Sequence, residues 1–295
     1  MRTIVLGAAA GGGLPQWNCG CLNCALARSG EIPAASQSSL AVSADGETWA
    51  ILNASPDIRT QLAATSALRP RALRDSPVTA ALVTNGDIDH VAGLLGLREK
   101  QSLTLFATTE ILGVLADNPV FAALDPALVT RRAVALGTPF QLVAGVTAEL
   151  FAVRGKVPLY LEGETVATDL EGEQTVGVRI ETDRGVAYYI PGCASVTPAL
   201  AERLTGADLV FFDGTLWEDD EMIRAGLGAK TGRRMGHISM SGPEGSIAAF
   251  DRLGVRRKIF VHMNNSNPVW RNGPERAKAM AAGWEIARDG MEVTL

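Results

Sequence analysis

Residues that could do chemistry gather first at Thr84–His90, which reads T-N-G-D-I-D-H. This stretch follows Val78–Val83, an apolar, β-branched run that predicts a buried strand. Polar side chains just after a buried strand lie where α/β proteins commonly bind substrates and cofactors. Asp89 and His90 end the stretch, and a carboxylate beside an imidazole is a donor pair that suits divalent metals.

Histidine is scarce in this chain, with only three residues: His90, His237 and His262. His262 follows the apolar run Lys258–Val261, and His237 lies where a loop approaches a helix. A single histidine is usually a hydrogen-bonded core or surface residue. Three histidines on loops after apolar strands favour a shared site instead. For His237, a structural role and a role near the substrate are about equally favoured.

Cysteine is concentrated at Cys19, Cys21 and Cys24, three of the four in the chain. Cysteines this close in sequence form strained disulfides, and C-x-C-x-x-C in a glycine-rich loop is a good thiolate cage for Zn²⁺. Three unrelated buried thiols are the simplest alternative, but the tight clustering disfavours it. A redox pair is a second alternative, and it is disfavoured because no helical pattern follows the C-x-x-C. We therefore predict a structural zinc.

Composition excludes several classes of protein. The chain has 295 residues, of which 47% are hydrophobic and 20% charged, as in ordinary globular proteins. The net charge of −5 disfavours a nucleic-acid or anionic-membrane partner. The N-terminus lacks the apolar length of a signal peptide, and no later run is long enough to span a bilayer. We therefore expect a cytoplasmic protein with no membrane span.

The remaining elements must position these side chains. Length alone allows one large α/β domain or two small ones, but no composition break marks a boundary, and we predict one domain over residues 1–295. Strands in both halves, with helices between them, favour two sheets with helices outside. The expected strands are 2–7, 38–43, 48–52, 78–83, 103–107, 140–143, 147–153, 175–181, 186–190, 209–212, 258–261 and a short final strand after the turn at Asp289-Gly290. The expected helices are one that Ser55-Pro56-Asp57 cap and that runs to about residue 64, and those at 109–115, 198–204, 243–253 and 274–281.

The opening stretch resembles the T-H-x-H-x-D-H signature of the metallo-β-lactamase superfamily, with Asn85 and Asp87 in place of the first two histidines. Four segments in combination resemble the family of pyrroloquinoline quinone (PQQ) biosynthesis protein B: Cys19–Cys24, Asn85–His90, Arg234–Ser239 and His262–Pro268. The resemblance implies an α/β protein with a four-layer αββα sandwich. It also implies a role in making the quinone cofactor from a crosslinked Glu–Tyr precursor.

The resemblance further implies which metal chemistry is left. Hydrolytic members hold two metals, but the first site has lost its imidazoles, and Gly192-Cys193 replaces the bridging aspartate. The second site keeps Asp89, His90 and His262, the donor set of non-haem Fe(II) oxygenases, which use O₂ as co-substrate. A related phosphodiesterase branch completes its zinc cage three residues after the last active-site histidine, which is Asn265 here.

The resemblance and the remaining donor set favour an oxygenase over a carrier or a hydrolase. We expect an iron-dependent oxygenase that hydroxylates the tyrosine ring of the precursor, with Asp87 and His237 as catalytic residues. The first alternative is a metal-containing carrier of PQQ or its precursor to the periplasm, and a weaker one is a hydrolase. A polycarboxylate ligand needs cationic partners, for which we select Arg154, Lys156, Arg233 and Arg234 because they lie beside motif positions. The sequence leaves the oligomeric state open, a homodimer included.

Overall fold

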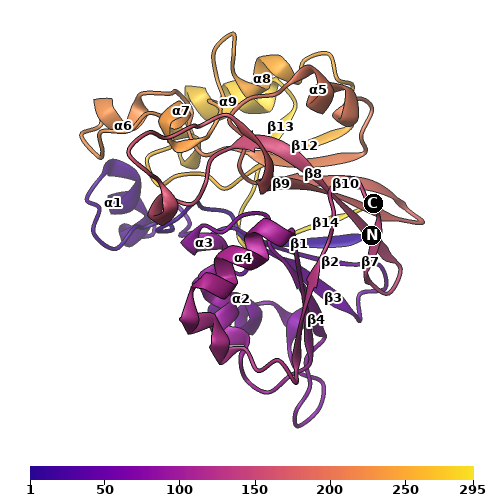
Figure 1. Ribbon diagram of the computed structural model, residues 1–295. Coiled ribbons are helices and arrows are strands. Elements are labelled where there is room, and N and C mark those ends of the chain that lie inside the picture. The colour runs from indigo at the N-terminus through magenta and orange to yellow at the C-terminus, as the bar shows by residue number, and fades with distance from the viewer.

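Two mixed β-sheets of seven strands each form the centre of the computed structural model, which describes residues 1–295. The strand orders are β14-β1-β2-β3-β4-β5-β6 and β13-β12-β11-β10-β9-β8-β7. Figure 1 shows helices on the outer sides of the sheets: α2 and α4 beside the first, and α5, α8 and α9 beside the second. The expected αββα arrangement is therefore confirmed.

The elements have the following bounds. The first sheet contains β1 (Arg2–Gly7), β2 (Ser39–Ser43), β3 (Trp49–Leu52), β4 (Val78–Leu82), β5 (Leu103–Ala107), β6 (Val129–Ala133) and β14 (Met291–Thr294). The second contains β7 (Phe140–Val143), β8 (Val146–Gly155), β9 (Leu170–Thr182), β10 (Gly185–Ile190), β11 (Leu209–Asp213), β12 (Arg257–Val261) and β13 (Trp284–Ile286). The α-helices are α1 (Leu22–Ser29), α2 (Ile58–Ala64), α3 (Ile88–Val91), α4 (Thr109–Asp117), α5 (Pro198–Leu204), α6 (Glu221–Arg224), α7 (Gly232–Met235), α8 (Ser246–Ala249) and α9 (Pro274–Ala281). Short 3₁₀ turns lie at Ser66–Leu68, Ala92–Leu97, Pro119–Ala123, Leu159–Leu161 and Pro268–Trp270.

Each sheet is antiparallel on one side and parallel on the other. Strands β3 to β6 run parallel in the first sheet, and β10 to β13 run parallel in the second. Polar residues follow the carboxyl ends of these parallel strands, where open α/β sheets bind ligands. Thr84 follows β4, Asp213 ends β11, and His262 follows β12.

One core serves both sheets. The larger of two clusters contains 70 buried side chains and draws on every layer, so both sheets contribute to the same core. Trp49 of β3 and Trp284 of β13 are among its largest fully buried members. The ring of Trp284 stacks on Phe260 of β12 with centroids 3.8 Å apart, which helps to fix the strand that carries His262.

The helix α1 was not predicted, because no helical pattern was recognised after the cysteines. It contains Cys24 and ends at Gly30, whose φ of 80° gives the left-handed residue that commonly terminates a helix. The expected helix over 243–253 is limited to the four residues of α8. Gly245 forms a tight turn before α8, where an added Cβ would lie 2.2 Å from the Ser241 carbonyl oxygen.

Strand β6 was also missed, because its side chains are mostly exposed and show no clear apolar alternation. It lies at the edge of its sheet, where exposure on both faces is common. None of the helices is both long and apolar enough to cross a lipid bilayer.

Candidate functional site: a histidine and carboxylate centre beside a cysteine cluster

The loop after β4 is held by buried polar contacts. The side-chain carbonyl oxygen of Asn53 accepts the backbone N–H of Thr84 at 2.9 Å. Asn85 Oδ1 accepts the backbone N–H of Asp87 at 3.0 Å and so fixes the turn into α3. Gly11, from the glycine-rich loop, packs against the Asp89 side chain, and a Cβ added to Gly11 would lie 3.3 Å from Asp89 Oδ2. This packing brings Asp89 and the next residue to a defined place.

Asp89, His90 and His262 form a compact group whose candidate donor atoms all lie within 4.8 Å of one another. His262 Nε2 lies 3.2 Å from Asp89 Oδ2, and His90 Nε2 lies 3.9 Å from the same atom. Burial acts to raise the pKa of Asp89, but the electrostatic interaction with the His90 ring and the hydrogen bond to His262 outweigh it and hold the pKa well below its usual range. The carboxylate is therefore ionised at neutral pH.

His90 provides the clearest sign that this group binds a ligand. Its side chain is buried, and neither ring nitrogen has a hydrogen-bond partner. Burial lowers the pKa of His90 to about 4, so the ring is neutral at neutral pH, which is the form that coordinates metals. A buried polar atom without a partner costs about 1–3 kcal/mol. A metal ion bound between His90, Asp89 and His262 would satisfy one of these nitrogens, so the residues fit a divalent metal.

His262 is oriented from behind. Its backbone has a φ of 57°, in the left-handed region that few residues other than glycine adopt. Its Nδ1 lies 2.9 Å from Thr215 Oγ1, which leaves Nε2 on the side of Asp89. Burial acts to lower the pKa of His262, but the hydrogen bond to Asp89 outweighs it and raises the pKa above its ordinary value.

Asp213 is a site residue that the sequence reasoning missed, although its place at the end of a buried strand was a usable signal. It is fully buried, and its carboxylate accepts the Cys193 N–H at 2.8 Å, the Thr215 hydroxyl at 2.6 Å and His237 Nδ1 at 2.7 Å. Burial acts to raise the pKa of Asp213, but the charge of His237 outweighs it, so the pKa is lowered. Asp213 therefore orients His237.

Asp213, His237 and His262 also lie within metal-binding distance of one another. Their facing atoms are already satisfied, however, because Thr215 Oγ1 lies 3.1 Å from His237 Nδ1 and 2.9 Å from His262 Nδ1. This group is a hydrogen-bond network behind the candidate metal-binding group of Asp89, His90 and His262. It contrasts with His90, whose nitrogens are unpaired.

The three clustered cysteines meet Asn265. Their Sγ atoms lie within 4.8 Å of one another. Asn265 Nδ2 lies 3.2 Å from Cys19 Sγ, 3.6 Å from Cys21 Sγ and 3.3 Å from Cys24 Sγ. A half-turn of the amide would place Oδ1 in the same position, since the two amide atoms are distinguished only by their partners. Three sulfurs and one amide oxygen around a common point fit a tetrahedral Zn²⁺.

The residues at the superfamily's first metal position are not gathered into a metal-binding group. Asn85 forms an isolated β-bridge with Thr175, and Cys193 is buried with a pKa raised far above its ordinary value by burial. Burial and the nearby charge of Asp89 raise the pKa of Asp87, while Lys156 partly offsets this. Asp87 therefore lies beside the metal-binding group without joining it.

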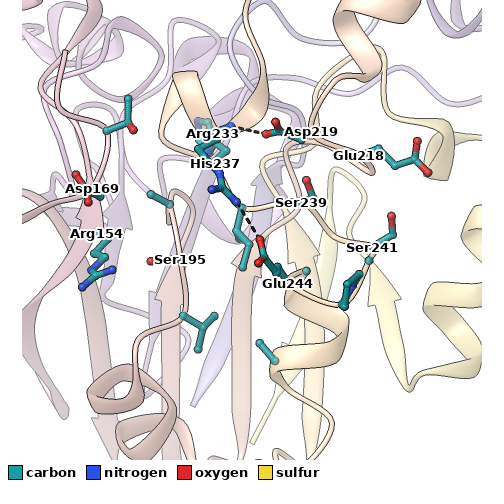
Figure 2. A pocket seen from close by; sticks show the side chains of 18 of the residues that line it. Arg154, Asp169, Ser195, Glu218, Asp219, Arg233, His237, Ser239, Ser241 and Glu244 are labelled. Atoms are coloured by element: carbon teal, nitrogen blue, oxygen red, sulfur yellow. Dashed lines mark hydrogen bonds and ion pairs between the residues drawn. The ribbon is translucent and has the colours of Figure 1, made fainter. Parts of the chain in front are cut away.

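The four predicted substrate-binding cations divide into two pairs. Lys156 and Arg234 converge on Glu162, which the sequence reasoning missed. Arg154 and Arg233 line a pocket of about 1060 Å³, which His237 also lines. Figure 2 shows His237 and Arg233 among the residues that line this pocket, together with Arg154 and Ser195, and the ion pair from Arg233 to Glu244. Asp89, His90 and His262 do not line the pocket, so His237 lies between it and the metal-binding group.

Comparison with known proteins was made on this basis. A model of the β-lactamase superfamily domain matches residues 48–263. The coenzyme PQQ synthesis protein B of Ruegeria pomeroyi is 60% identical over 296 residues, covering all of both chains. The crystal structure of Zn²⁺-bound PqqB from Methylobacterium extorquens is 52% identical, covers all of both chains and superposes with a TM-score of 0.99.

A diphosphatase of the PhnP family is similar in fold alone, with 21% identity, a TM-score of 0.71 and coverage of 100% of this chain and 97% of that one. The family match covers most of the sequence, and the curated relative is similar along its whole length. The chain therefore belongs to the β-lactamase superfamily and, within it, to the family of coenzyme PQQ synthesis protein B.

Proposed function

We propose that this protein is an iron(II)-dependent oxygenase of PQQ synthesis that hydroxylates the tyrosine-derived ring of a polycarboxylate precursor. The observation that carries the proposal is the buried, unpaired imidazole of His90 beside Asp89 and His262. Two imidazoles and one carboxylate are the donor set of non-haem Fe(II) oxygenases, which keep positions open for O₂ and substrate. The family name of the relatives supports the pathway.

We further propose that Cys19, Cys21, Cys24 and Asn265 hold a structural zinc. The convergence of three sulfurs on one amide supports this assignment. The printed description of the relative from Methylobacterium extorquens, which names bound Zn²⁺, is consistent with a zinc in this family. A closed set of four ligands is typical of structural zinc sites, whereas catalytic sites keep an open position.

Bound iron(II) would supply the activation of O₂, and the chain's own residues would do the rest. Thr215 holds the His262 ring so that Nε2 faces the metal position. His237, oriented by the buried Asp213, offers its other ring nitrogen to a group in the adjoining pocket and can accept or return a proton there. Asp87, whose pKa is raised by burial, is a second group placed to handle a proton.

The hydroxylation balances when a two-electron reductant is supplied in addition to O₂. A ring C–H bond becomes C–OH with one oxygen atom of O₂, and the other oxygen leaves as water. Two electrons and two protons are required, and a two-electron reductant must supply the electrons. The carboxylates of the precursor would bind Lys156, Arg154, Arg233 and Arg234, because guanidinium and ammonium groups are the usual partners of carboxylates.

The deciding experiment compares metals in one protein preparation. Protein is reconstituted with Fe(II) under anaerobic conditions and then mixed with precursor, reductant and O₂, which it should consume. Protein loaded only with Zn(II) should not consume O₂, because zinc has no redox chemistry. His90→Ala and His262→Ala should abolish turnover while the cysteine-bound zinc remains. Hydroxylation by zinc-only protein would refute the oxygenase assignment. Tight precursor binding without O₂ uptake under any metal would assign the carrier role instead.

A further inference from the structure

The segment between β8 and β9, residues 157–169, crosses from one side of the site to the other, and we call it the strap. The Tyr160 hydroxyl donates to the Gly86 carbonyl oxygen at 2.7 Å, in the loop that leads to Asp89. Pro158 packs on the same glycine, where an added Cβ would lie 3.0 Å from Pro158 Cγ. At its other contact, Glu162 binds Arg234 of α7. The strap therefore runs from the Thr84–His90 loop to α7.

Glu162 is held by three cations. Lys156 Nζ lies 3.0 Å from Oε1, Arg234 Nη2 lies 2.9 Å from Oε2, and Lys230 Nζ lies 3.8 Å from Oε2. Arg234 Nη1 also donates to Oε1 at 3.3 Å, so the guanidinium grips both carboxylate oxygens. The hydrogen bonds from Arg234 lower the pKa of Glu162 to about 2. This is the geometry that a protein uses to recognise a carboxylate ligand.

The charge of this cluster favours exchange of one carboxylate for another. Three positive groups surround a single negative one, so the cluster has an excess of positive charge. The side chain of Lys156 is only 11% exposed, and a buried ammonium without a carboxylate partner is costly. An anion that replaces Glu162 would keep Lys156 and Arg234 paired.

The cluster of Glu162 and its three cations lies beside the Thr84–His90 loop. Thr175 Oγ1 donates to the Lys156 carbonyl oxygen at 3.1 Å, and Thr175 forms a β-bridge with Asn85. An added Cβ on Gly236, the residue before His237, would lie 3.3 Å from Lys156 Cγ. A ligand carboxylate bound to Lys156 would therefore place the rest of the ligand next to Asp87 and His237.

The distal part of the strap is held weakly. Residues 163–169 take part in no backbone hydrogen bond. Four of them, Val166, Ala167, Thr168 and Asp169, line the pocket that His237 also lines. Movement of residues 163–169 would break no backbone hydrogen bond and would change access to the pocket, as expected for a stretch of low local stability.

We propose that Glu162 occupies the subsite of one substrate carboxylate, and that the strap must lift from Lys156 and Arg234 before a polycarboxylate can bind there. This inference rests on the proposed function, because it assumes a polycarboxylate substrate. It makes Glu162 a determinant of specificity, since only a ligand whose carboxylate competes with an internal one would open the strap.

The experiment uses PQQ as the polycarboxylate probe and the metal-replete full chain. The dissociation constant is measured for the wild type, for Glu162→Gln and for Glu164→Gln. Glu164 is an exposed residue of the same strap, so its variant removes the same charge without touching the cations. Glu162→Gln should bind PQQ at least about fivefold more tightly, because the Glu162 carboxylate no longer competes with PQQ for Lys156 and Arg234. Glu164→Gln should bind PQQ as the wild type does.

A second readout follows the strap itself and does not depend on a measurement of affinity. The chain has three tyrosines, so 3-fluorotyrosine labelling gives three ¹⁹F signals, and the Tyr160 signal is assigned by loss in Tyr160→Phe. PQQ should shift the Tyr160 signal of the wild type towards its position in Glu162→Gln. Equal affinities in all three proteins, or a Tyr160 signal that PQQ leaves unchanged, would overturn the inference alone. Absence of binding by every protein would overturn the proposed carboxylate substrate, and the inference with it.

Discussion

At the scale of single residues, one hydroxyl links the two halves of the site. Thr215 Oγ1 donates to Asp213 and lies within hydrogen-bond distance of His262 Nδ1 and His237 Nδ1. With the hydroxyl proton directed to Asp213, Thr215 Oγ1 is an acceptor for His262 Nδ1–H, and this tautomer leaves the Nε2 lone pair for a metal. Such outer partners of metal-binding histidines fix both the tautomer and the ring orientation.

Replacement of Thr215 by valine should weaken metal binding at the Asp89–His90–His262 group by roughly 10- to 100-fold, with the fold retained. The two side chains have the same shape, so the hydroxyl is the only loss. Competition with a chelator measures the effect. Thr205→Val, at the exposed end of α5, is the control and should bind metal as the wild type does. Equal affinities in both variants would show that Thr215 has no orienting role.

At the scale of elements, the cysteine loop and the His262 loop are fastened together. The amide of Asn23 in α1 donates to the carbonyl oxygens of Asn265 and Asn267 at 2.8 and 2.9 Å. The backbone of Ala10 donates to the Met263 carbonyl oxygen at 2.8 Å. A zinc at the cysteines would therefore stabilise the loop that begins with His262.

Removal of one thiolate tests this link. Cys21→Ala should release the structural zinc and lower Tm by at least about 5 °C, because a structural metal contributes its binding energy to folding. Metal content by mass spectrometry and thermal unfolding measure the two effects. Cys193→Ala removes a buried thiol outside the cluster and should keep the zinc. A Cys21→Ala protein with full stability and its zinc in place would rule out the assignment.

The strap should respond to acid in a defined direction. The pKa of Glu162 is lowered from 4.5 to about 2 in the folded chain, mainly by Arg234. Its ion pairs therefore stabilise the closed strap above the unfolded pKa of 4.5 and are lost as the pH falls from there towards about 2. The Tyr160 ¹⁹F signal should move over that range, and in Glu162→Gln it should not. The signals of the buried Tyr188 and Tyr189 report global unfolding, and a simultaneous change in all three would contradict local opening.

At the scale of the whole molecule, we propose that residues 1–295 form one domain. The main apolar core reaches from Trp49 in the first sheet to Trp284 in the second, and the candidate metal ligands come from both halves of the chain. Neither sheet could bury its inner face alone. Loss of one sheet should therefore destabilise the other.

Equilibrium unfolding checks this prediction. With 5-fluorotryptophan, the native ¹⁹F signals of Trp49 and Trp284 should disappear at the same denaturant concentration, since coincident transitions mark two-state unfolding. Each signal is assigned by substitution with phenylalanine. Two separate midpoints would divide the chain into independent units.

Much of this architecture was predictable from sequence. Buried strands such as Val78–Leu82 and Leu209–Asp213 carry continuous apolar runs, and α9 begins with Pro274 as a helix commonly does. Elements with weak patterns were missed, because β6 is mostly exposed and the residues of α1 show no recognisable helical pattern. The helix expected over 243–253 was overestimated, since the tight turn at Gly245 depends on backbone contacts that periodicity does not report.

The candidate site was predictable only where its residues carry a recognisable motif. Asp89, His90, His262 and the cysteines were identified in this way, and the structure brings each group together. Asp213, Thr215 and Glu162 were not assigned roles, because their importance comes from contacts across long sequence separations. Glu162 illustrates this well, since it meets Arg234 across 72 residues.

The left-handed backbone at His262 bears on how this chain can evolve. A residue with a Cβ costs about 1–2 kcal/mol in that conformation, whereas glycine adopts it freely. His262→Gly should therefore unfold at higher denaturant than His262→Ala, although both lose the ligand, and equal midpoints would show that the backbone is unstrained. A lineage that no longer needed the metal would gain stability by drifting to glycine here. Histidine at this position therefore lowers the stability of the fold, and selection for its metal-binding chemistry would be needed to keep it.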